Sequence, residues 1–174
     1  MTTLFVAALK EETPGLNKFY HTGVGKLNAA ISLMDLIENI KPNKIINYGT
    51  AGSLNNNLLG LIKCTNFKQR DMDARGLLHF QLGETPFDKI STISFSKNGY
   101  ICGSGDNFVS NDIEIICDVV DMEAYALAKT CRNLDIDFVS YKYISDDGNA
   151  DDWEKNCSKG VEEFKKVLEY YDNL

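Results

Sequence analysis

The feature that most constrains the fold is an alternation of apolar runs of strand length with segments of helical periodicity. This pattern predicts strands at residues 3–8, 44–49, 61–67, 89–95, 99–103, 117–122 and 137–145, and a short strand that runs into a glycine turn within residues 19–25. It predicts helices at residues 26–40 and 123–134, and a last helix from residue 151. Strands that alternate with helices predict an α/β fold with a mixed, largely parallel twisted sheet flanked by helices. The length of 174 residues predicts a single domain, residues 1–174.

The first and last predicted helices each carry an apolar stripe at helical spacing. The stripes consist of Leu27, Ile31, Met34 and Ile37, and of Val161, Phe164, Leu168 and Tyr171. Each stripe is typical of one face of an amphipathic helix.

The composition argues against several classes of partner and site. The chain has 25 acidic and 18 basic residues and a net charge of -7, which argues against binding to nucleic acid or to an anionic membrane surface. We expect no signal peptide and no transmembrane segment, because the first apolar run lacks a basic flank and no run approaches 20 residues. Five cysteines without a C-x-x-C pair indicate no metal site and no disulfide framework, and favour a cytoplasmic location.

Polar residues and one aromatic residue, Phe108, gather at the predicted carboxyl ends of the strands, where sheets of this kind bind ligands. They are Glu11, Glu12, Thr50, Ser104, Asp106, Phe108, Asp121, Glu123, Ser145 and Asp146. We expect Lys10 and Lys142 to be the cations among them, which leaves carboxylates available as general acid, general base and hydroxyl acceptor. With Phe108 to stack on a planar ring, this set suits the cleavage of a glycosidic bond.

Six segments carry a family resemblance. They read A-A-L-K-E-E, T-G-V-G-K-L-N-A-A, I-I-N-Y-G-T-A-G, G-S-G-D-N-F-V, V-D-M-E-A and Y-I-S-D, in this order. Together they resemble the methylthioadenosine/S-adenosylhomocysteine nucleosidases of the nucleoside phosphorylase superfamily. The resemblance implies a cofactor-independent hydrolase of nucleoside metabolism and methionine salvage. Its reaction would release adenine and a free pentose from a 5'-modified adenosine.

The resemblance also implies catalytic roles for two carboxylates. Glu12 matches the base that deprotonates the attacking water, and Asp146 matches the acid that protonates N7 of adenine. For this division of roles we expect Asp146 to be buried against the adenine ring and Glu12 to lie nearer to water.

The remaining matches are to substrate-binding positions. Glu123 matches the carboxylate that accepts the ribose hydroxyls, with Met122 beside the sugar, and Phe108 and Val109 match the wall that stacks on the purine. The other candidates are Thr50, Ala51 and Gly52 in the turn that lines the ribose, Asp121 beside Glu123, Ser145 beside Asp146, and Lys142 where relatives carry arginine.

The turn after the first strand favours water over phosphate as the nucleophile. Phosphorylases of the superfamily have a Gly-Asp-Pro-x-Arg turn there, whereas this chain has Lys10, Glu11 and Glu12. A purine nucleoside phosphorylase, a hydrolase of another purine conjugate and a non-catalytic adenosine-binding module remain alternatives. The chain is also shorter than typical relatives, so the 5'-group stays open among methylthioadenosine, S-adenosylhomocysteine and 5'-deoxyadenosine.

Residues 77–88 are apolar without a helical or strand period. By resemblance they align with a segment that crosses a homodimer interface and covers the substrate of the neighbouring subunit. The resemblance therefore implies a homodimer in which Leu78 and Pro86 of one chain lie near the partner's pocket. The alternative is a loop folded back on its own sheet.

Overall fold

The computed structural model describes residues 2–54, 58–77, 79–88, 90–109, 113–146 and 150–173. Within these residues, eight strands form one mixed sheet. The strands are β1 (Thr3–Ala7), β2 (Phe19–His21), β3 (Lys44–Ser53), β4 (Leu61–Gln69), β5 (Ile93–Ser94), β6 (Tyr100–Ser104), β7 (Val119–Asp121) and β8 (Asp137–Asp146). The helices are η1, a 3-10 turn (Lys10–Glu12), α1 (Lys26–Ile40), α2 (Ala124–Asn133), α3 (Ala150–Asn156) and α4 (Val161–Asp172).

Parallel pairing dominates one part of the sheet, where β1 lies between β2 and β3 and β8 runs parallel to β3 along its length. At its carboxyl end β3 also pairs with β7, which pairs in turn with β6. Because β6 pairs with β4, and β4 pairs antiparallel with β8, the strands β3, β8, β4, β6 and β7 close into a small barrel. The barrel brings strand ends that are far apart in sequence to one place.

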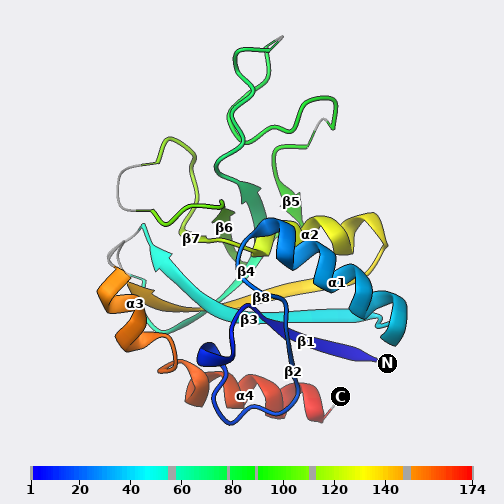
Figure 1. Ribbon diagram of the computed structural model, residues 1–174, viewed down its shortest axis with the longest axis vertical. Coiled ribbons are helices and arrows are strands. Elements are labelled where there is room, and N and C mark those ends of the chain that lie inside the picture. Colours follow the sequence, from blue (N-terminus) through cyan, green and yellow to red (C-terminus); the bar gives the residue numbers. More distant parts are fainter. Residues whose placement is uncertain are drawn as a thin grey trace.

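Helices cover both sides of the sheet, and the two-residue period of the strands divides the core accordingly. Leu4 and Val6 of β1 face the cluster that includes α1 and α2, whereas Phe5 and Ala7 face the cluster that includes Phe164 of α4. Figure 1 shows α1 and α2 on one side of the strands and α4 on the other, with long loops projecting beyond β4 and β5. The predicted fold class, a largely parallel sheet flanked by helices, is confirmed.

Three predicted boundaries were wrong. β3 does not end at Gly49 but continues to Ser53, because its partners β8 and β7 extend the ladder through the glycines. Of the strand predicted at residues 89–95, residue 89 lies outside the described residues, and among residues 90–95 the strand is reduced to the two residues of β5. The single helix predicted from residue 151 is two helices, α3 and α4, separated by a turn at residues 157–160.

Most of the apolar stripe of α1 does not face the core. Leu27, Ile31 and Met34 are 71%, 61% and 49% exposed, whereas the helix buries Ala29 and Leu33 against the sheet. Ile37, the last residue of the predicted stripe, packs against the core. A helix normally turns its apolar stripe toward the core, so the exposed stripe indicates a surface that another molecule can cover.

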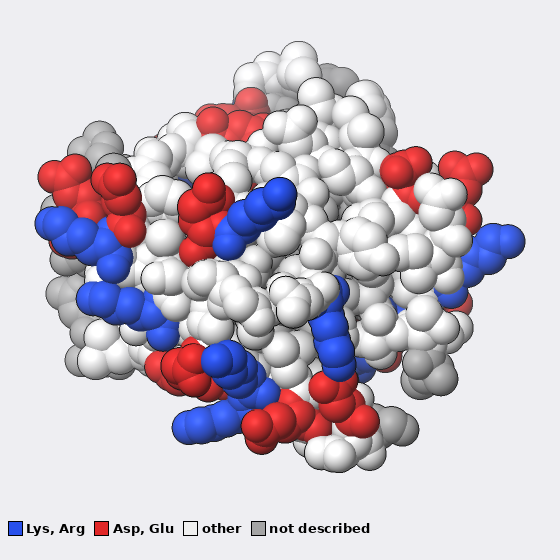
Figure 2. Space-filling view, turned by 60° about the horizontal axis from the view of Figure 1, so that its bottom comes forward, with Lys and Arg blue, Asp and Glu red and all other residues white. Residues whose placement is uncertain are grey.

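Acidic and basic side chains are mixed on the side where α4 lies. Figure 2 shows both signs interspersed around a broad uncharged area, and Lys18 and Asp172 form an exposed ion pair at 2.6 Å. No helix in the described part of the chain has the length and apolar character needed to cross a membrane.

Candidate active site

A cavity of about 240 Å³ opens where the carboxyl ends of β1, β3, β7 and β8 converge. Its lining comprises Ala8, Leu9, Glu12, Val24, Thr50, Ala51, Gly52, Arg70, Asn107, Phe108, Val109, Val120, Asp121, Met122, Glu123, Asp146 and Trp153. Four carboxylates thus meet a mainly apolar wall, as is typical of small-molecule sites.

Glu12 is placed by the short turn η1, which directly follows β1 and returns its side chain to the sheet edge. The side chain is held on both carboxylate oxygens. Oε1 accepts the backbone N–H and the hydroxyl of Thr50, each at 2.8 Å, and Oε2 accepts the Leu9 N–H at 3.1 Å. Because charge-assisted hydrogen bonds are directional, these donors orient the buried carboxylate before any ligand arrives.

Asp146 is the last residue of β8, and its carboxylate meets the end of β3. Ser145 Oγ donates to Asp146 Oδ2 at 2.7 Å. A Cβ atom at position 52 would lie 3.0 Å from Asp146 Oδ1, so glycine at this position makes room for the carboxylate. Asn156 of α3 donates to the Ser145 carbonyl at 2.7 Å, which ties the strand end to the helix.

Glu123 follows β7 and begins α2, and its carboxylate crosses to the glycine turn before α1. Gly25 donates its N–H to Glu123 Oε1 at 2.8 Å. Gly25 has φ of +90°, a conformation that residues with a side chain rarely adopt, so the contact depends on glycine. Burial, and then the charge of Asp121, raise the pKa of Glu123 to about 7.

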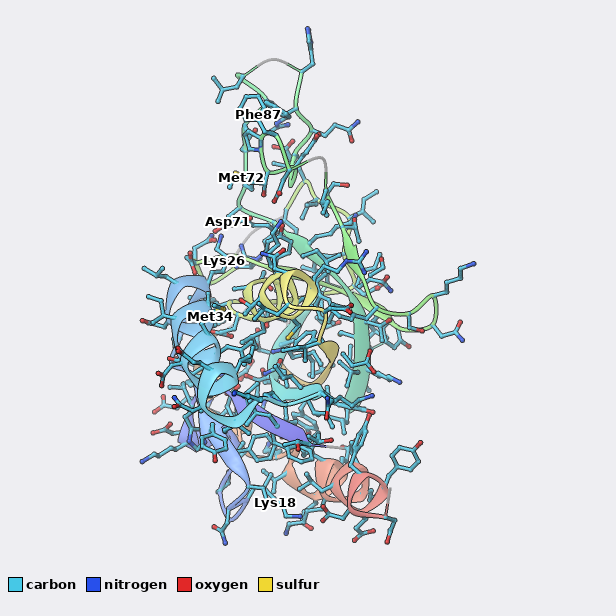
Figure 3. All side chains as sticks on the ribbon, turned by 90° about the vertical axis from the view of Figure 1, so that its right-hand side faces the viewer. Lys18, Lys26, Met34, Asp71, Met72 and Phe87 are labelled. Carbon is cyan, nitrogen blue, oxygen red and sulfur yellow. The ribbon has the colours of Figure 1, made fainter. Side chains whose placement is uncertain are left out.

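The glycine turn is itself fixed by an ionic cluster at the start of α1. Lys26 Nζ contacts Asp71 Oδ1 at 2.5 Å, and Asp106 Oδ1 accepts the Lys26 N–H at 2.7 Å. Asp106 in turn donates its own N–H to Asp71 Oδ2 at 2.8 Å. Figure 3 shows Lys26 and Asp71 together where the projecting loops meet α1. The cluster therefore connects the glycine turn to two loops beside the cavity.

A fully buried ion pair lies beneath this part of the cavity. Lys142 Nζ and Asp121 Oδ2 are 2.8 Å apart, and each side chain is 2% exposed. Asp121 also accepts Ser104 Oγ at 2.5 Å and the Ala124 N–H at 2.9 Å. Burial acts to raise the pKa of Asp121, but Lys142 and these donors lower it below its ordinary value. Burial acts to lower the pKa of Lys142, but Asp121 raises it above its ordinary value. Both groups are therefore charged at neutral pH.

Comparison with known proteins places the chain in a family. Residues 106–171 match the model of the phosphorylase superfamily. A nucleosidase of Staphylococcus haemolyticus, named for 5'-methylthioadenosine and S-adenosylhomocysteine, is 29% identical over 219 aligned positions that cover 94% of this chain and 95% of that one. Its counterpart in Staphylococcus aureus strain JH9 is 31% identical over 157 positions, which cover 75% of this chain and 68% of the other. This chain belongs to the 5'-methylthioadenosine/S-adenosylhomocysteine nucleosidase family.

The fold agrees with that membership. A Helicobacter pylori nucleosidase of this family, solved as a mutant with 5'-methylthioadenosine in its active site, superposes with a TM-score of 0.84. The two chains are 18% identical, and the superposition covers 97% of this chain and 98% of the other. As a member of this nucleosidase family the chain is an N-glycosyl hydrolase that acts on 5'-modified adenosines.

The cavity collects most of the residues that the sequence singled out for this nucleosidase. Its lining contains Glu12, Thr50, Ala51, Gly52, Phe108, Val109, Asp121, Met122, Glu123 and Asp146. Ser145 and Lys142 are buried behind the lining, and Pro86 lies on the projecting loops away from the cavity of its own chain. Leu78 falls outside the described residues.

Three expectations about the site need correction. Glu12 is more deeply buried than Asp146, the reverse of the expected order, because the turn η1 folds Glu12 under Thr50. The carboxylate of Asp121 is occupied by Lys142, Ser104 and Ala124 instead of projecting beside Glu123. Lys10 and Lys142 are not the cations of the cavity wall, since Arg70 lines it.

Arg70 and Trp153 line the cavity, and sequence reasoning missed both. Arg70 donates to the side chain of Asn107 at 2.9 Å and to the Gly105 carbonyl at 3.2 Å, and so shapes the loop before Phe108. Trp153, the single tryptophan of the chain, interrupts an otherwise polar segment, which was the available signal.

Proposed function

We propose that Glu12, Asp146 and Glu123 carry out the hydrolysis of the N-glycosidic bond in this cavity. The observation that supports the roles is the convergence of these three acids, from three separate strand ends, on one cavity with an aromatic wall. In this proposal residues 1–174 act as one domain in the cytoplasm, in nucleoside metabolism and methionine salvage.

The proposed reaction divides the chemistry between the two sides of the sugar. Glu12 accepts a proton from water as the water oxygen bonds to C1' of the ribose. Asp146 gives a proton to N7 as the bond between C1' and N9 breaks and its electron pair passes to the purine. Phe108 stacks on the base, and Ser145 holds Asp146 through Oδ2. Adenine and a free pentose are the products.

Glu123 stabilises the sugar in this scheme. Its carboxylate accepts the ribose 2'- and 3'-hydroxyls, and these bonds strengthen as positive charge develops on the sugar. The N–H of Gly25 leaves acceptor capacity on the Glu123 carboxylate for these hydroxyls. Asp121 and Lys142 support Glu123 from below, because Asp121 accepts the N–H of the next residue, Ala124.

Methylthioadenosine is expected to yield adenine and free methylthioribose in a buffer without phosphate, metal or nicotinamide. The turn after β1 presents carboxylate where a phosphorylase presents cationic and backbone donors, so phosphate is disfavoured. Inosine is the matched control, because its 6-oxo group does not suit the hydrogen bonds that an aspartate and its neighbours offer to a 6-amino ring. Chromatography of the products measures both. A strict need for phosphate, with a sugar 1-phosphate as product, would contradict hydrolysis. Faster cleavage of inosine would contradict the expected preference for a 6-aminopurine.

The value of kcat/KM is expected to fall as the pH drops through about 7, since the pKa of Glu123 is raised to about 7. Below this pH the protonated carboxyl loses acceptor capacity for the ribose hydroxyls, and kcat/KM reports ionisations of the free enzyme. A profile from pH 5 to 9 measures the effect. An acid limb that stayed near pH 4.5 would contradict the role of Glu123.

The same shift has a consequence for stability. The folded pKa of Glu123 lies above its ordinary value of 4.5, so the native state binds more protons between these two values and Glu123 costs stability as the pH rises through them. Glu123→Gln is therefore expected to raise the free energy of unfolding at pH 8 by roughly 1–3 kcal/mol while lowering turnover. Urea unfolding at pH 8 and at pH 4 tests this, and an equal effect at both pH values would contradict it.

We further infer that the enzyme acts as a two-fold symmetric homodimer. Leu27, Ile31 and Met34 form an exposed apolar stripe on α1, and Leu77 and Phe87 are exposed on the projecting loops. Figure 3 places Met34 on the outer side of α1 and Phe87 on the loops above it. Exposed apolar surfaces of this kind suit an isologous interface in which the loops reach the partner's cavity, Pro86 and Leu78 among their residues.

Leu27→Asp is expected to convert the protein from dimer to monomer at micromolar concentration and to lower its activity. The change places a charge within an apolar interface, whereas Leu59→Asp changes another highly exposed leucine outside the stripe and serves as the matched control. Sedimentation velocity with parallel activity assays measures both variants. A wild-type protein that sediments as a fully active monomer would contradict the dimer.

A further inference from the structure

Trp153 reaches from α3 into the cavity and contacts the residue that holds Glu12. Its indole Nε1–H donates to Thr50 Oγ1 at 2.9 Å. The same Thr50 hydroxyl donates to Glu12 Oε1 at 2.8 Å, and the Thr50 backbone N–H reaches that oxygen at 2.8 Å as well. Three residues from α3, β3 and η1 thus form one chain of hydrogen bonds.

The direction of this chain follows from the chemistry of the groups. An indole N–H can only donate, and a hydroxyl has one proton and two lone pairs. Because Trp153 occupies a lone pair of Thr50 Oγ1, the hydroxyl is oriented with its proton toward Glu12 Oε1. Trp153 therefore sets the orientation of the Thr50 hydroxyl, and through it acts on Glu12.

We propose that Trp153 is a positioning residue for the hydrolysis, which acts through Thr50 to fix the carboxylate of Glu12. The inference rests on the proposed role of Glu12 as the base. Two donors anchor Oε1, whereas Oε2 accepts one N–H among the described residues, that of Leu9. The proton taken from water therefore goes to Oε2, and the Trp153–Thr50 bond keeps that oxygen at a constant position during turnover.

A residue that serves only as part of the cavity wall would behave differently. In that case phenylalanine, which is flat and aromatic, would replace the indole with little effect on kcat, and any loss would appear in KM. The positioning role predicts the opposite division, because the hydrogen bond is lost while the aromatic wall remains.

Trp153→Phe is expected to lower kcat by about tenfold and to change KM by less than about threefold, the effect of loosening one hydrogen bond to an ionised group. Thr50→Val is expected to lower kcat by at least as much. The double variant is expected to be no slower than Thr50→Val alone, because both changes act through the same hydroxyl. Thr50→Ser, which keeps the hydroxyl, is expected to keep most of the wild-type kcat. Glu154→Gln, an exposed change on α3, is the matched control with unchanged kinetics.

A second measurement needs no activity. Because the chain has one tryptophan, ¹⁵N-labelled protein gives one indole N–H resonance. In the wild type this proton is expected to exchange slowly with solvent, and in the nearly isosteric Thr50→Val variant it is expected to exchange at least tenfold faster.

The outcomes separate this inference from the proposed function. Three results would each overturn the positioning role while leaving hydrolysis intact. They are a kcat in the double variant lowered by the product of the two single effects, an unchanged kcat in Trp153→Phe, and an exchange rate of the indole proton that Thr50→Val does not change. Wild-type protein that releases no adenine would instead overturn the proposed function.

Discussion

Glu12→Gln is expected to lower the turnover of methylthioadenosine by at least about a hundredfold, the range for loss of a positioned base. Glutamine keeps the shape of the side chain and its carbonyl oxygen can still accept the Thr50 donors, but its NH2 group can neither accept the Leu9 N–H nor take a proton from water. Asp146→Asn is expected to cost about as much, because it removes the proton that the leaving adenine needs. Single-turnover kinetics measures both effects on the chemical step.

Each of these changes has a neighbour that serves as its control. Glu11→Gln alters an exposed acid in the same turn, and Asp137→Asn alters an exposed acid at the start of β8. Both controls are expected to keep turnover within about twofold of the wild type, as is usual for surface changes. Binding of adenine should survive in the glutamine and asparagine variants. Near-normal turnover by Glu12→Gln would require a different base.

Lys142→Met is expected to lower the free energy of unfolding at pH 7 by about 3–5 kcal/mol, the usual cost of leaving one buried charge without its partner. Lys142 and Asp121 are each 2% exposed, so the methionine would leave the Asp121 carboxylate without a cation or with an unfavourable proton. Urea unfolding measures the loss. Lys18→Met removes the cation of an exposed pair, with Asp172, and is expected to cost less than about 1 kcal/mol.

The double variant Lys142→Met with Asp121→Asn separates pairing from packing. Asparagine carries no charge, and its single carbonyl oxygen can still accept one of the two donors, Ser104 or Ala124, so part of the lost stability is expected to return. A single variant as stable as the wild type would show that the pair is not needed to hold β7 and β8 together.

The parts of the fold that local patterns determine were predictable from the sequence. β1, β8, α1 and α2 lie close to their predicted positions, because apolar runs and helical periodicity are properties of contiguous residues. The closed barrel was not predicted. β4 pairs with β8 along its first half and with β6 along its second, and no local pattern encodes such a change of partner.

The residues of the candidate site likewise divide into those that local sequence patterns reveal and those that depend on the tertiary structure. Glu12, Glu123 and Asp146 were found because each follows or ends a strand, and the strand ends of an α/β sheet meet at one edge. Thr50 was found although β3 continues past it to Ser53. Trp153 was missed because it lies on a helix whose approach to Thr50 depends on the tertiary structure. The burial of Glu12 was misjudged for a similar reason, since it depends on how η1 folds beneath β3.

The most direct test of the central claim, that Glu12 activates water to hydrolyse 5'-modified adenosines, is the reaction in ¹⁸O-labelled water without phosphate. Mass spectrometry of the products is expected to show one equivalent of adenine and a pentose that carries the label on C1 when the reaction is followed over short times. The Glu12→Gln variant is expected to form less than about 1% as much labelled pentose in the same time. An unlabelled sugar product, or release of adenine at the wild-type rate by Glu12→Gln, would contradict the account.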